Sequence, residues 1–218
     1  IWSNDELAPV SKEIAQRCEE VGNKLNSVGT TVSFAAKPEH DFMKAEINYQ
    51  LLLQSVMQSG LPEDEYQKIE KLASCLDKND LSVDAILAKG TVLSHRNWLR
   101  QNYAREQIKI SWSKFFEEWD VLICPQLATT AIEHDHKKIS ERTVMVDNQE
   151  QRYFQQIFWP GLAVNAHLPS TVFPTGLSSD GMPIGLQIIG GAYEDKTTIK
   201  FAELYEEEFK TFVVPNLD

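Results

Sequence analysis

The stretch between residues 159 and 191 places the tightest limit on how this chain can fold. Residues 170–173 form a short β-branched run that stops at Pro174, which has no N–H to extend a ladder. Residues 184–189 form a second apolar run. The Asp-Gly pair between the two runs tolerates the positive φ angles of a tight turn. The stretch therefore predicts a β-hairpin with a slightly long loop.

The second strand of this hairpin has two different faces. Strand alternation places Gly185, Gln187 and Ile189 on one face and three branched aliphatic side chains on the other. A glycine beside an amide indicates that another piece of backbone approaches closely, and a buried amide must be hydrogen-bonded. We therefore expect a partner segment to lie against the Gln187 face.

The rest of the chain alternates between helical and strand patterns. Apolar spacing predicts six helices, over residues 9–25, 41–60, 62–74, 91–119, 153–165 and from 195 onward. Residues 30–34 and 121–124 are predicted strands, and residues 142–153 a small hairpin. Residues 83–87 fit neither pattern. These elements indicate an α/β fold, a mixed β-sheet flanked by helices, with the strand order left open.

Two helices carry specific expectations about their buried faces. The helix over 91–119 has a broad apolar face that includes Leu99 and Tyr103. In the last helix Ile199 and Tyr205 are expected to face inward, and the acidic run at 206–208 to face solvent.

Composition narrows the class of protein. The chain has 218 residues and a formal net charge of −11, which argues against nucleic acid or an anionic membrane as partner. No apolar run is long enough to cross a bilayer. Cys18, Cys75 and Cys124 are odd in number and far apart, which is typical of reduced thiols, so we expect a cytoplasmic protein. The chain opens on Ile1-Trp2 without an initiator Met, which we interpret as a cut end.

The run Glu133-His134-Asp135-His136 is the best candidate for chemistry that the chain could perform alone. Two imidazoles with a carboxylate between them can begin a metal site, but zinc needs three or four ligands. Lys137 and Lys138 follow at once and disfavour a dication. Three readings stay open: a metal site, a loop that orders over a pocket, and plain surface. We expect no metal.

The hairpin and its flanks resemble a known family. The segments that carry the resemblance are Leu168-Pro169-Ser170-Thr171, Phe173-Pro174-Thr175-Gly176 and Asp180-Gly181-Met182-Pro183-Ile184-Gly185-Leu186-Gln187. This ordered string looks like the C-terminal hallmark of amidase-signature hydrolases. Asp120, followed by an apolar strand that ends in Cys124-Pro125, is also similar to the family. His167 departs from it, because the family usually has glycine there.

The resemblance implies an amide-bond hydrolase that uses a serine nucleophile, a bridging serine on a cis peptide and a lysine base, with no cofactor. A Gly- and Ser-rich loop would supply the oxyanion hole. No such loop occurs here, since Ser178-Ser179 belongs to the hairpin turn. Lys12 after Ser11, and Ser113-Lys114, lie on predicted helices without a glycine-rich loop beside them. We therefore expect residues 1–218 to be the C-terminal portion of a single amidase-signature domain, with no catalytic residue.

The resemblance also suggests roles for particular residues. Gln126, His134 and Trp159 are candidates for a wall of the substrate pocket. Gly185 and Gln187 would support the catalytic loop of the missing half, which would leave Gln187 without its partner in this chain.

The expected partners are a small-molecule amide in the full-length enzyme and, through an exposed sheet edge, a second copy of the chain. Nucleic acid and membrane are not expected partners. Two alternatives stay open. One is a non-catalytic α/β module that associates with another chain, and the other is a metal hydrolase built on His134 and His136.

Overall fold

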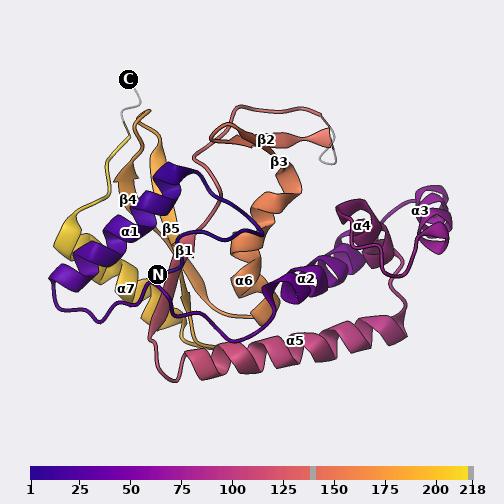
Figure 1. The fold of residues 1–218 in the computed structure, drawn as a ribbon, viewed down its shortest axis with the longest axis horizontal. Coiled ribbons are helices and arrows are strands. Elements are labelled where there is room, and N and C mark those ends of the chain that lie inside the picture. Colours follow the sequence, from indigo (N-terminus) through magenta and orange to yellow (C-terminus); the bar gives the residue numbers. More distant parts are fainter. Residues whose placement is uncertain (138–140, 216–218) are drawn as a thin grey trace. The chain divides into compact units, whose positions relative to one another are not determined.

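The computed structural model describes residues 1–137 and 141–215, and the chain divides into two compact units (Figure 1). The first unit consists of Ile1–Pro38 and Trp112–Asp218, and the second of Glu39–Ser111. Among the described residues, no helix has both the length and the apolar composition needed to cross a bilayer.

The first unit contains all the strands of the described chain. Its helices are α1 (Lys12–Ser27), the 3-10 helix η2 (Tyr153–Ile157), α6 (Phe158–Ala166) and α7 (Asp195–Phe209). Its strands are β1 (Val121–Pro125), β2 (Thr143–Val146), β3 (Gln149–Arg152), β4 (Ser170–Leu177) and β5 (Pro183–Gly190). The second unit holds α2 (Phe42–Met57), α3 (Glu63–Cys75), α4 (Val83–Thr91) and most of α5 (His95–Phe115).

The main sheet is antiparallel, with strand order β1-β5-β4, so β5 is its centre. Gln187 of β5 lies opposite Cys124 of β1 and Val172 of β4. The alternation predicted for β5 is confirmed on both faces. α7 covers the Leu186 face, where Tyr205 packs edge-on against Phe173 with ring centroids 4.8 Å apart. On the other face, the Gln187 amide donates to the Trp159 carbonyl of α6.

The outer edge of β4 is blocked along its second half. The guanidinium of Arg17 on α1 donates to the carbonyls of Thr175 and Leu177, and the Thr211 hydroxyl donates to the Pro174 carbonyl. A strand edge whose carbonyls are already bonded is a poor template for another strand. This half of the β4 edge is therefore closed to a further strand.

Most element predictions are confirmed, with shifted ends. α1 begins at Lys12 because the Ser11 hydroxyl accepts from the Ile14 N–H, and the Asp41 carboxylate caps α2 in the same way. The unassigned residues 83–87 begin α4, which Ser82 caps. The small hairpin of β2 and β3 turns at Asp147, whose φ is 51°.

Three expectations about secondary structure and helix burial were wrong. Residues 30–34 form no strand, because they have no ladder partner within the described chain. On α5, Leu99 and Tyr103 are exposed rather than buried. On α7, Ile199 is exposed, and Thr198 meets the sheet in its place through a hydrogen bond between its hydroxyl and that of Thr171.

The backbone conformation of His167 explains why the family usually has glycine at this position. It caps the C-terminus of α6 with φ 56° and ψ 44°, in the left-handed region that glycine adopts without steric cost. A glycine at this position is therefore conformationally favoured, and the histidine holds the same turn at some cost in backbone strain.

Candidate functional site

The candidate site is the outer edge of β1, the side of this strand that no other strand of the described chain pairs with. β1 pairs with β5 on one side only. On the other side the Ile123 carbonyl accepts a hydrogen bond from the Trp2 N–H at 2.9 Å. Because backbone groups alternate in direction along a strand, the N–H groups of Ile123 and Val121 also point away from β5.

Residues 1 and 2 lie beside this edge, and each donates one backbone hydrogen bond. The Ile1 nitrogen donates to the Ser33 carbonyl at 2.7 Å, while the Trp2 N–H reaches Ile123. Further along, the Ser11 N–H donates to the Ala128 carbonyl, so this segment runs parallel to the chain that contains β1. Burial lowers the pKa of the Ile1 amine, against smaller opposing effects of Cys124 and Cys18.

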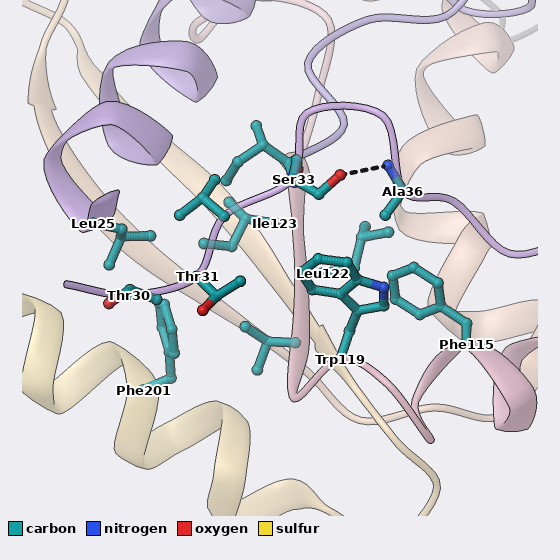
Figure 2. A pocket seen from close by; sticks show the side chains of 13 residues that line it. Leu25, Thr30, Thr31, Ser33, Ala36, Phe115, Trp119, Leu122, Ile123 and Phe201 are labelled. Carbon is teal, nitrogen blue, oxygen red and sulfur yellow. Dashed lines mark hydrogen bonds between the residues drawn. The ribbon is translucent and has the colours of Figure 1, made fainter. Parts of the chain in front are cut away.

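A cavity of about 50 Å³ adjoins Ile1 and Ile123 (Figure 2). Thr31 and Ser33 lie on one wall, and Leu122 and Ile123 on the other. A wider hollow of about 460 Å³ continues past Trp119 toward α7, and the two share five lining residues: Thr30, Thr31, Trp119, Val121 and Phe201. We call the cavity and the hollow together the β1 slot. The slot separates residues 30–33 from β1, which is why these residues have no ladder.

The lining of the small cavity limits its chemistry. It consists of apolar side chains and three hydroxyls, with no carboxylate, imidazole or thiol. The Ser33 hydroxyl is used locally, since it accepts from the Ala36 N–H at 3.0 Å. The lining of the small cavity therefore supplies no acid–base side chain for catalysis. The slot can accept an extended peptide through main-chain hydrogen bonds to Val121 and Ile123.

Gln187 is bonded within its own chain. Its side chain is 2% exposed, its Nε2 donates to the Trp159 carbonyl at 3.0 Å and to Cys124 Sγ at 3.3 Å, and its Oε1 accepts from the Ser170 hydroxyl at 2.8 Å. The expectation that this amide lacks its partner is therefore wrong. The partner segment on the Gln187 face is α6.

Gly185 is explained by β4. A Cβ at this position would lie 2.9 Å from Val172 Cγ1, closer than side-chain packing permits. The predicted close approach of another backbone is not found here, because the near neighbour is the Val172 side chain of β4 and the Phe173 carbonyl oxygen would lie 3.5 Å from the added Cβ, an ordinary contact.

Trp159 and Gln126 lie in different environments. Trp159 is fully buried, packs edge-on against Trp2 at 5.4 Å, and donates from Nε1 to the Ala8 carbonyl at 3.1 Å. Its ring is therefore part of the core. Gln126 follows β1 directly, and its Oε1 is buried without a hydrogen-bond partner among the described residues. That oxygen can accept a hydrogen bond from an incoming group.

His134 lies on an exposed loop, with its ring centroid 6.4 Å from that of His136. Residues 1–137 and 141–215 contain no group of three or more His, Cys, Asp or Glu side chains that could hold a metal. Lys138 falls outside these residues. The structure therefore brings Trp159 and Gln187 together, and leaves His134 apart from both.

Sequence reasoning missed the β1 slot because backbone groups and small hydroxyl side chains form it. Every residue except proline has the same N–H and C=O groups, so no residue type marks an unpaired strand edge. The one available signal was a β-branched run at residues 30–34 with no obvious partner strand.

The fold defines a class of protein. In solved structures the same arrangement occurs in a bacterial aryl acylamidase of the amidase-signature family, with a TM-score of 0.64 at 17% identity over 91% of this chain. It also occurs in a glutamyl-tRNA(Gln) amidotransferase subunit from Thermotoga maritima, with a TM-score of 0.65 at 16% identity over 96% of this chain. These likenesses confirm the predicted α/β class.

The chain belongs to the amidase family, since residues 1–199 match the family described as Amidase. One subunit of glutamyl-tRNA(Gln) amidotransferase from Thermosynechococcus vestitus is 36% identical over 111 residues, and the same subunit from Brevibacillus brevis is 34% identical over 97 residues. These matches cover 50% and 44% of this chain, but only 21% and 18% of the relatives. The solved chains named above are covered to 41% and 43%. The resemblance deduced from the hairpin is confirmed.

Proposed function

We propose that this chain is the C-terminal portion of an amidase that hydrolyses carboxylic amides, and that its catalytic residues lie in the remainder of the same domain. This chain supplies sheet strands and part of the substrate pocket. The observation that carries the proposal is the β1 slot: a strand edge whose outward N–H groups at Val121 and Ile123 have no ladder partner among the described residues, beside a small cavity whose lining has no acid–base side chain. A strand from the remainder of the domain would satisfy those groups.

The chemistry belongs to the remainder of the domain. A serine there would attack the amide carbonyl, and the leaving nitrogen would depart as ammonia or an amine once protonated. Water would then hydrolyse the acyl-enzyme to the acid. A bridging serine and a lysine would carry the protons, and backbone N–H groups would stabilise the oxyanion. No metal or cofactor takes part in this scheme.

The residues of this chain would support that chemistry without taking part in it. Gln187 joins β5 to α6 and β4, and Gly185 leaves room for the Val172 side chain of β4, so both would hold the sheet on which the catalytic loop would rest. Gln126 contributes a buried acceptor to the pocket wall. His134 would join that wall from its loop, and Trp159 would support it from the core. The substrate is a small amide, and the enzyme acts in the cytoplasm.

The experiment compares this 218-residue chain with the longest product of its gene on simple amides. Thr31→Trp fills the slot from an exposed position, and Ser27→Trp places the same ring at the exposed end of α1 as a control. We expect both variants of the short chain to fold. In the longer product Thr31→Trp should abolish turnover and Ser27→Trp should not. Equal activity of the two longer variants would refute the role of the slot.

The alternative of a non-catalytic module that pairs with another chain also starts from the β1 edge. An unpaired edge can recruit a second copy as readily as a strand of its own domain. Sedimentation of the 218-residue chain distinguishes the two. A dimer that Thr31→Trp dissociates, together with a longer gene product that hydrolyses no amide, would favour the module.

A further inference from the structure

The second unit contains a groove of about 550 Å³ between the first half of α2 and the second half of α5. Two polar bridges cross it, one from Asn48 to Gln101 and one from His40 to Ser111. We call it the α2/α5 groove. It uses no residue of the β1 slot, and the inference drawn from it does not depend on the function proposed above.

The first bridge leaves one strong acceptor unused. Asn48 is 3% exposed, and its Nδ2 donates to the main-chain carbonyl of Gln101 at 2.8 Å and to its Oε1 at 2.9 Å. Asn48 Oδ1 is buried and has no hydrogen-bond partner among the described residues. A buried acceptor without a partner carries a cost in free energy, because it has given up its hydrogen bonds to water. A ligand N–H that reaches this oxygen would recover part of that cost.

The second bridge carries no charge. His40 Nδ1 lies 3.1 Å from Ser111 Oγ, and the imidazole packs on Phe42 with ring centroids 4.3 Å apart. Burial lowers the pKa of His40 to about 4, against the opposing effect of Asp41, so the ring is neutral at physiological pH. The groove's other charged groups are exposed: Glu39, and Asp41 with Lys44, which form an ion pair at 3.1 Å.

The wall between the bridges is uncharged and mostly apolar, with Gln107 as its one polar residue. Ala45, Ala104 and Ile108 line it, and the ten residue steps from Gln101 to Ser111 span about 15 Å of helix. An uncharged interior with a polar group at each end excludes ions, because an ion would lose its hydration there without a counter-charge. The fitting ligand is neutral and elongated, with a hydrogen-bond donor at one end.

We propose that the α2/α5 groove binds a small primary carboxamide with an aliphatic tail. The amide N–H donates to Asn48 Oδ1, the amide oxygen accepts from the side-chain amide of Gln101, and the tail lies along Ala104 and Ile108. A carboxylate of the same length would face Asn48 Oδ1 with a second acceptor, and an ammonium would enter with an uncompensated charge.

Hexanamide, hexanoate and hexylammonium are the matched probes, each titrated into the 218-residue chain while its backbone amide NMR spectrum is recorded. Hexanamide should produce saturable shifts confined to α2 and α5, and the two ions should produce none that saturate. No saturable shift with hexanamide, or equal shifts with all three probes, would overturn the proposal.

A pair of variants on one helix locates the site. Ala104→Leu fills the groove from an exposed position, whereas Ser113→Leu adds the same side chain about 180° away around α5. Neither touches a bridge, so circular dichroism should show both folded. Ala104→Leu should weaken hexanamide binding at least about tenfold, and Ser113→Leu should leave it unchanged. Unaltered binding to Ala104→Leu would place the ligand elsewhere and refute the assignment.

Discussion

Replacing Gln187 by methionine tests how the sheet of the first unit is held together. The side chain is buried at the centre of β5 and makes three hydrogen bonds, to Trp159 on α6, to Cys124 on β1 and to Ser170 on β4. Methionine preserves the length and the approximate volume, so the change removes the bonds without opening a large cavity. The variant therefore isolates the polar contribution.

The expected magnitude follows from those contacts. Each bond contributes about 0.5–1.5 kcal/mol net, and the Trp159 carbonyl and Ser170 hydroxyl lose their amide partner. We expect the free energy of unfolding to fall by about 2–4 kcal/mol, which for a chain of this size lowers the melting temperature by about 5–15 °C.

The assay is urea unfolding followed by tryptophan fluorescence, with thermal unfolding alongside. Gln67→Met is the matched control, because Gln67 lies exposed on α3 and its side chain donates to Glu63 on the same helix, at 2.8 Å. The control should change stability by less than about 0.5 kcal/mol. If Gln187→Met changed stability as little as the control, the assigned role of this amide in joining β5 to its neighbours would be refuted.

Three further outcomes are expected. Gly90→Ala should destabilise the second unit by about 1–3 kcal/mol, because its Cβ would lie 2.8 Å from Gln54 Cβ and 3.1 Å from the Leu51 carbonyl; Gly60→Ala, with nothing within 4 Å, should not. The pKa of His40 is lowered from 6.5 to about 4, so the unfolded chain binds this proton more readily. The stability it contributes is complete above 6.5 and is lost as the pH falls toward 4, and urea midpoints across that window should show a flatter slope in His40→Gln. A thiol reagent should label Cys75 in the native chain and all three cysteines only in denaturant, since burial raises the pKa of Cys124 to about 12 and that of Cys18 still further.

Local patterns predicted the elements of the fold well where each element carries its own signals. The hairpin of β4 and β5 combines alternation, a proline stop and an Asp-Gly turn, and its central strand forms as expected. α1 and α2 carry both an apolar stripe and a capping side chain. In these cases the residues that specify the element are close in sequence, so a single chain segment contains the necessary information.

Burial was predicted less well, because it depends on neighbours that the segment does not contain. Leu99 and Tyr103 have the spacing of a buried face, yet no described element of the second unit covers them. On α7, Thr198 rather than Ile199 faces the sheet. Gly190 leaves room for its short side chain, and Thr171 offers it a hydroxyl partner.

The candidate site was predicted in part. The close packing at Gly185 and the hydrogen bonding of Gln187 follow from strand alternation, but the identity of the neighbours does not. Identifying β4 and α6 as these neighbours requires the strand order, which periodicity does not determine. The β1 slot was not predicted, since it is a property of spacing between main-chain segments.

Ammonia release from simple amides by the purified 218-residue chain tests the central claim most directly, with the longest product of its gene assayed beside it. If catalysis resides outside this chain, the 218 residues should release no ammonia above the blank while the longer product turns over. Turnover by the short chain that a serine substitution within it, such as Ser111→Ala or Ser170→Ala, abolishes would contradict the account.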